Sequence, residues 1–324
     1  MDQSVEQSAL SQNLAIGVDI GGTSIKFAVV DLDKGKTVKD TSCPTPNATA
    51  DEIAALVARY VNVLVHSYPD ISAVGMGVPG AMNPERTMVH YPPNFTHWTT
   101  EPFAEMVASK LVTIDKVMMD NDAKCAALAE MHFGSAKNEK FFLHATLGTG
   151  VGGAIVSDGE IYRGAFGGAG EFGHVIVDCN GPVSLSGIRG VLEGYIGQRY
   201  LSERTIEKLA KYKKETPLRQ FVSSGHLEPK QIAEAAAAGD AFSTEVLAEA
   251  GKYLGVAMAT VASLLDIRLF IVSGGVAQAG DILLEPAREA LRANVLEQQR
   301  SSVEIRASKL GTKAGVIGAA LLTV

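Results

Sequence analysis

Apolar residues gather in short runs along the chain, and most runs end at glycines or polar turn residues. In the first part, Thr49 is a predicted N-cap, and apolar residues recur after it at helical spacing. The pattern predicts strands at 14–20, 24–33, 35–46, 71–80 and 116–122, and helices at 49–68 and 103–111. This order predicts an α/β domain with mixed strand pairing.

A similar order follows in the second part of the chain. The pattern predicts a hairpin at 140–162, helices across 192–265, strands at 269–275 and 304–310, and a closing helix at 314–322. Both parts open on a hairpin that turns on glycines, which indicates an internal duplication. We expect a small N-terminal domain at 1–120 and a larger domain at 121–311, with the C-terminal helix at 312–324 packing back on the first domain.

Composition and charge limit the classes of function that this chain can have. A net charge of −7 argues against a nucleic-acid-binding face. The three cysteines lie far apart without CxxC spacing, which fits a reducing compartment and no cysteine-rich metal site. Neither a signal peptide nor a membrane-spanning run is evident, so we expect a cytoplasmic protein that makes no membrane contact.

Three glycine turns follow predicted buried strands, in DIGGTSIK (19–26), LGTGVGG (147–153) and SGGVAQAG (273–280). Glycine lets backbone N–H groups approach a phosphate closely. Asp19 is placed to orient hydrated Mg²⁺, and Thr23 to bond a phosphate oxygen. Each turn alone also fits a plain hairpin, and none matches a P-loop or a GxGxxG motif. Together, at the strand ends of a duplicated chain, they predict a nucleotide site.

Three polar residues stand where the strand at 116–122 gives way to a helix: Asp120, Asn121 and Asp122. A helix N-cap explains one of them. A carboxylate at such a position can also accept the proton of a hydroxyl that attacks phosphorus. We predict that Asp122 is this base, that Asn121 hydrogen-bonds the substrate and that Asp120 has a structural role.

The motifs in combination resemble a known family. LGTGVGGAIVSDGEIYRGAFGGAGEFGH (147–174) is similar to the signature of the ROK family (repressors, open reading frames and sugar kinases). DIGGTSIK, GVPGAM, DNDAKCAALAE and IVSGGVAQAG resemble its other landmarks, in order, and the likeness runs from about residue 15 to the end of the chain. The resemblance implies the actin/hexokinase/Hsp70 fold, with two ribonuclease-H-like domains around a cleft. It also implies ATP- and Mg²⁺-dependent phosphorylation of a hexose by a homodimer or higher homo-oligomer.

The resemblance also assigns roles to single residues. Asp122 matches the family's catalytic base. The positions matched to sugar binding are Asn94, Asn121, Glu171, His174 and Glu193. The positions matched to the nucleotide are Asp19, Gly21, Gly22, Thr23, Lys26, Gly148, Thr149, Gly150, Gly274 and Gly275.

One family feature is missing from the sequence. Many members hold a structural zinc with a histidine and three cysteines in a CxCGxxGCxE pattern, where this chain has SLSGIRGVLE. Ser184, Ser186 and Val191 occupy the cysteine positions. Hydroxyl and valine side chains cannot replace thiolates on zinc, so we expect no structural zinc and a loop held by packing and hydrogen bonds. His174 is then expected to contact sugar or to serve as a structural hydrogen-bonding residue.

Several functions remain in competition. The leading one is transfer of the γ-phosphoryl group of MgATP to a hexose, at C6 of glucose. N-acetylglucosamine, N-acetylmannosamine, fructose and allose are alternative acceptors. The motif SGGVAQAG favours ATP over polyphosphate as donor. Outside the class stand a non-catalytic sugar-sensing protein and a sugar-responsive repressor, but we expect no DNA-binding domain before Asp19.

Overall fold

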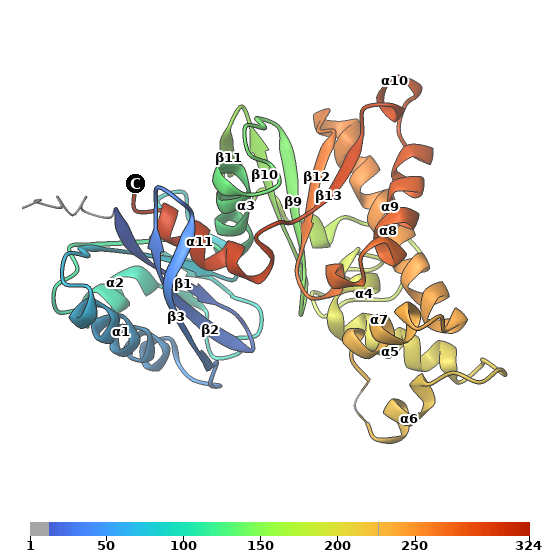
Figure 1. Cartoon of the computed structure of the whole chain (residues 1–324), viewed down its shortest axis with the longest axis horizontal. Helices are drawn as coiled ribbons and strands as arrows, with labels where there is room; N and C mark the ends of the chain where they lie inside the picture. Colours follow the sequence, from blue (N-terminus) through green and yellow to red (C-terminus); the bar gives the residue numbers. More distant parts are fainter. Residues whose placement is uncertain (1–12, 226) are drawn as a thin grey trace, which may run out of the picture.

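The computed structural model describes residues 13–225 and 227–324, so the first dozen residues lie outside the described part. Two five-stranded sheets organise the chain (Figure 1). The first has the order β3-β2-β1-β4-β8, in which β1 runs antiparallel to β2 and parallel to β4. Its strands are β1 (Leu14–Ile20), β2 (Ser24–Asp31), β3 (Lys36–Pro44), β4 (Ala73–Val78) and β8 (Lys116–Asn121).

The second sheet repeats this topology, with the order β11-β10-β9-β12-β13. Here β9 runs antiparallel to β10 and parallel to β12, as β1 does with β2 and β4. Its strands are β9 (Phe142–Leu147), β10 (Val151–Ser157), β11 (Glu160–Tyr162), β12 (Leu269–Ser273) and β13 (Glu304–Ala307). The predicted duplication is therefore present in the strand order. In each sheet the first hairpin turns on glycines, and both turns lie where we predicted phosphate contacts.

Helices pack against both sheets. Their bounds are α1 (Ala50–Ser67), α2 (Phe103–Ala108), α3 (Asp122–Phe133), α4 (Glu193–Ile196), α5 (Gln198–Leu209), α6 (Leu218–Ser223), α7 (Pro229–Ala237), α8 (Ala241–Leu265), α9 (Asp281–Ala293), α10 (Glu297–Arg300) and α11 (Ala314–Leu321). Thr49 caps α1 in a capping box with Glu52, as the sequence predicts, and Asp240 caps α8. Across residues 13–225 and 227–324, no helix has the length and apolar character needed to cross a membrane.

The last helix, α11, lies against the first sheet, although β13 of the second sheet precedes it (Figure 1). Val316, Ile317 and Ala320 share a buried cluster with side chains of β1 and β2 and with α3. The approach is close, since a Cβ added at Gly17 would lie 1.9 Å from the Val316 carbonyl oxygen. With β8 ending the first sheet at Asn121 and α3 beginning at Asp122, a domain boundary near residue 120 remains our proposal.

Two parts of the fold were not predicted. Three short strands form a small sheet between the predicted strand at 71–80 and the predicted helix at 103–111: β5 (Ala81–Met82), β6 (Val89–His90) and β7 (Thr100–Glu101). They are too short to show a period in the sequence. Helices α9 and α10 were also missed, although Leu283, Leu284, Ala287 and Leu291 recur on the buried face of α9 at helical spacing.

Candidate functional site

Asp122 is the first residue of α3, at the carboxyl end of the first sheet. Its Oδ1 accepts a hydrogen bond of 2.9 Å from the backbone N–H of Ala123. Burial is the largest cause that raises the pKa of Asp122, and the negative charges of Asp19 and Glu171 add to it, so that the pKa reaches about 6. A carboxyl group with this pKa is ionised at neutral pH and is basic enough to accept a proton from a hydroxyl in the transition state.

Asn121 is the N-cap of α3. Its Oδ1 accepts from the backbone N–H groups of Ala123 and Lys124, at 3.0 and 3.3 Å. Its Nδ2 donates to the Gly80 carbonyl at 3.2 Å, which ties α3 to the turn after β4. The cap therefore belongs to the residue that we predicted as a substrate partner. An amide nitrogen carries two hydrogens, so Asn121 can cap the helix and also donate to a hydroxyl.

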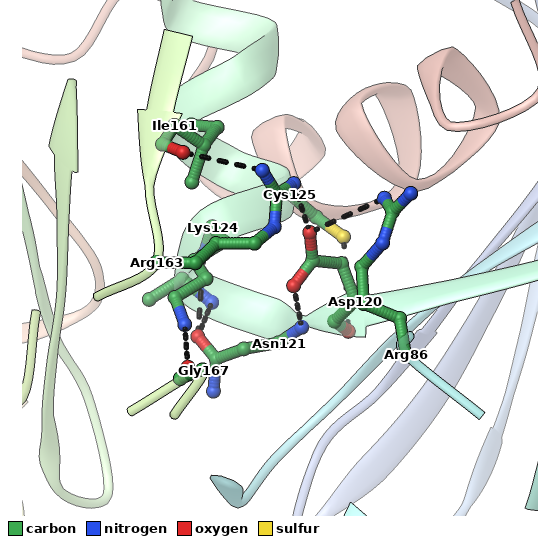
Figure 2. A network of polar contacts seen from close by, with 9 residues as sticks. Arg86, Asp120, Asn121, Lys124, Cys125, Ile161, Arg163 and Gly167 are labelled. Atoms are coloured by element: carbon green, nitrogen blue, oxygen red, sulfur yellow. Dashed lines mark hydrogen bonds and ion pairs between the residues drawn. The ribbon is translucent and has the colours of Figure 1, made fainter. Parts of the chain in front are cut away.

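Asp120 is buried and lies in a network of charged side chains (Figure 2). Its Oδ2 is 2.6 Å from Nη2 of Arg163 and 3.7 Å from Nη1 of Arg86, and its Oδ1 accepts from the backbone N–H of Asn121. These contacts agree with the structural role predicted for Asp120. The arginines were not predicted, because neither is near Asp120 in the sequence and Arg163 lies 43 residues away.

Glu171, His174 and Glu193 converge in the second half of the chain. His174 Nδ1 is 3.5 Å from Glu171 Oε2. The interaction with the neighbouring Glu171 carboxylate raises the pKa of His174, and the charge of Glu193 acts in the same direction against burial. Glu193 Oε2 accepts the backbone N–H of Val151 at 2.9 Å, so this carboxylate also supports the turn at 148–150. Carboxylates and an imidazole placed together can bind several hydroxyls of one small polar ligand.

The first glycine turn joins β1 to β2. Asp19 Oδ2 is 3.2 Å from Nζ of Lys26. Gly22 and Thr23 are exposed, and Gly21 closes the turn with a hydrogen bond from its N–H to the Ser24 carbonyl. Asn94, predicted as a sugar ligand, packs on this turn: a Cβ on Gly22 would lie 2.9 Å from Asn94 Nδ2. Asn94 therefore lies at the first glycine turn.

The second and third glycine turns lie side by side. Gly274 has a φ of +96°, and a Cβ there would be 2.3 Å from the Leu147 carbonyl oxygen just before the second turn. Below them, His144 of β9 and Ser273 of β12 share a buried hydrogen bond of 3.0 Å. A Cβ at Gly148 or at Gly275 would meet nothing within 4 Å. At both turns the glycine backbone therefore faces open space, which a phosphate or a nucleoside needs in order to approach it closely.

The loop in place of the family's zinc-binding loop is connected by hydrogen bonds. The Ser184 and Ser186 hydroxyls are 2.6 Å apart, and the Leu185 N–H donates to the Tyr200 hydroxyl at 2.6 Å. The Tyr195 hydroxyl donates to Asp178 Oδ2 at 2.9 Å, which joins the loop to α4 just after Glu193. Within residues 13–225 and 227–324, there is no group of three or more His, Cys, Asp or Glu side chains that could hold a metal ion.

The chain is similar to known proteins along nearly its whole length. The glucokinase of Streptomyces coelicolor is 34% identical over 316 residues, which cover 95% of this chain and 96% of that protein. A ROK family glucokinase from Streptomyces griseus, solved with glucose and AMPPNP, has a TM-score of 0.84 at 34% identity, covering 95% of this chain and 98% of that one. A ROK hexokinase from Thermus thermophilus has a TM-score of 0.76 at 28% identity, covering 95% and 97%.

These structures confirm the predicted actin-like ATPase fold. The ROK family pattern itself matches residues 15–324, which is nearly the whole chain. The order of the glycine turns, the aspartate at the start of α3 and the Glu171–His174 pair all fall within the matched region. The chain belongs to the ROK family.

Proposed function

We propose that this ATP-dependent sugar kinase transfers the γ-phosphoryl group of MgATP to the C6 hydroxyl of glucose. The observation that carries the proposal is Asp122, a basic carboxylate at the start of α3, whose pKa responds to Asp19 on the nucleotide side and to Glu171 on the sugar side. One residue of the predicted nucleotide site and one of the predicted sugar site thus both raise the pKa of the Asp122 carboxylate. The glucokinase relatives support glucose as the acceptor.

In the proposed reaction the sugar hydroxyl lies within hydrogen-bond reach of Asp122. As the hydroxyl oxygen forms a bond to the γ-phosphorus, the bond from phosphorus to the bridging oxygen of ADP breaks, and the hydroxyl proton passes to Asp122. Glu171, His174 and Glu193 bind other hydroxyls of the sugar and fix its orientation. Asp122 then releases its proton to solvent, and ADP and the sugar phosphate leave.

The residues present fit MgATP. The open space above Gly148 and Gly275 leaves room for phosphates and adenosine to approach the backbone closely. Asp19, at the end of β1 and beside Lys26, would bind the hydrated Mg²⁺ ion, which neutralises charge on the phosphates when it is bound. Lys26 would hold the Asp19 carboxylate in place and add positive charge near the phosphates.

The acidic limb of the pH profile reports on Asp122. The base must be ionised to act, and its pKa is raised from 3.8 to about 6. We therefore expect kcat/KM for the sugar to be constant near neutral pH and to fall about tenfold per unit below pH 6, measured at saturating MgATP. A profile that stays flat down to about pH 5 would contradict Asp122 as a base with this pKa.

The acceptor is tested by ADP release from MgATP across hexoses and N-acetylhexosamines, with and without a zinc chelator. We expect glucose to give the highest kcat/KM and the chelator to have no effect, since Ser184 and Ser186 cannot hold zinc. A maximum at N-acetylglucosamine, N-acetylmannosamine or fructose would replace glucose as the acceptor. No turnover across the panel, with sugar binding intact, would leave a non-catalytic sugar-sensing protein.

A further inference from the structure

The segment 163–170 joins β11 to Glu171, and two side chains tie it to the start of α3 (Figure 2). Arg163, at its first position, pairs with Asp120 at 2.6 Å. Lys124, in the first turn of α3, donates from Nζ to the Gly167 carbonyl oxygen at 2.6 Å. Both ties therefore connect the strand-to-helix junction that carries Asp122 to the segment that carries Glu171.

Lys124 is an unusual residue for its place. It is only 6% exposed, and its neighbours Ala123 and Cys125 are buried as well. Burial lowers the pKa of Lys124, while the nearby carboxylates of Asp120 and Glu171 act in the opposite direction. A buried ammonium group costs free energy that an apolar side chain of similar volume would not. Stability alone therefore does not explain a lysine here.

Gly167 is held from its other side as well. It is buried with a φ of +82°, and an added Cβ would lie 2.2 Å from the Met82 carbonyl oxygen of β5. The backbone at Gly167 is thus enclosed between α3 and the small sheet. Lys124 supplies a hydrogen-bond donor to its carbonyl from the α3 side.

We propose that Lys124 is a positioning residue: by anchoring the Gly167 carbonyl, it sets the place of Glu171 relative to Asp122 and thereby the affinity for sugar. The Arg163–Asp120 pair anchors the other end of the same segment. The inference rests on the proposed function in one respect, namely that Glu171 binds the sugar. It adds a residue that contacts neither the sugar nor the nucleotide.

The kinetic test replaces Lys124 by methionine, which keeps the volume and removes the donor. We expect KM for the sugar to rise about tenfold or more, because a displaced Glu171 no longer meets the sugar hydroxyl in the right geometry. KM for MgATP should stay within about twofold. Lys140→Met is the matched control, since Lys140 is exposed and forms an ion pair with Asp158, which is exposed as well. It should change neither constant.

A double substitution separates positioning from a general loss of structure. If Lys124 acts through Glu171, adding Lys124→Met to Glu171→Gln should raise the sugar KM little beyond the value for Glu171→Gln alone. Full multiplication of the two effects would overturn the proposal. Should Lys124→Met not fold, Arg163→Gln takes its place, because Arg163 is partly exposed, and an unchanged sugar KM in that variant would overturn the proposal too.

Hydrogen exchange tests the anchor without substrates. In Lys124→Met we expect faster exchange of the amides at 163–171 than in the wild type, with exchange in α8 unchanged. Unchanged exchange at 163–171 would overturn the anchor. If instead the wild-type protein phosphorylates no sugar but this segment loosens in the variant, the proposed function fails while the anchor stands.

Discussion

Replacing Asp122 by asparagine should lower kcat for sugar phosphorylation by roughly 10³-fold, the range expected when a general base is removed. The amide is nearly isosteric with the carboxylate but cannot accept the proton. KM for MgATP should change little, because we propose that the glycine turns, and not Asp122, bind the nucleotide. The measurement is ADP release at saturating MgATP over a range of sugar concentrations. The acidic limb of the pH profile should also disappear from the residual activity.

Asp158→Asn serves as the control for this substitution. Asp158 is exposed in the turn between β10 and β11 with a φ of +54°, a conformation that asparagine also adopts. Its kcat should equal that of the wild type. If Asp122→Asn retained kcat within about tenfold and kept the acidic limb, another group would have to accept the proton and the proposed mechanism would be wrong.

The elements that the sequence predicted well are those set by local chemistry. The apolar runs of β1 and β4 are buried on both faces, and the cap of α1 is a threonine directly before the first turn of the helix. Neighbouring residues decide these features, so a linear pattern shows them. The repeated strand order follows in turn, because each half has the same succession of runs.

The remaining details depend on contacts between distant segments. Asp120 and Asn121 are both good capping residues, and their roles separate only because Arg163 approaches one and Gly80 the other. Lys124 follows Asp122 in a helix of mostly small residues, where a lysine is ordinarily solvent-exposed. Its burial results from the segment 163–170 lying over it. No spacing in the sequence predicts that contact.

The second large effect is expected where α11 crosses α3. A Cβ at Gly318 would lie 1.6 Å from the Cys125 carbonyl oxygen and 2.3 Å from its carbonyl carbon. Both are backbone atoms, so no side-chain rotation relieves the clash, and the two helices must move apart. We expect Gly318→Ala to lower the free energy of unfolding by about 3 kcal/mol, measured by urea denaturation.

Gly318→Ala should also change the geometry of the candidate active site, because α3 begins at Asp122 and is packed between α11 and the second sheet. A shift of α3 moves Asp122, the proposed base, relative to the proposed sugar ligands, so kcat should fall by about tenfold in the fraction that stays folded. Gly168→Ala is the control, since its new methyl group would meet nothing within 4 Å. Equal unfolding free energies for the two variants would mean that the contact between α3 and α11 tolerates a methyl group. The close approach at Gly318 would then hold neither the C-terminal helix nor Asp122 in place.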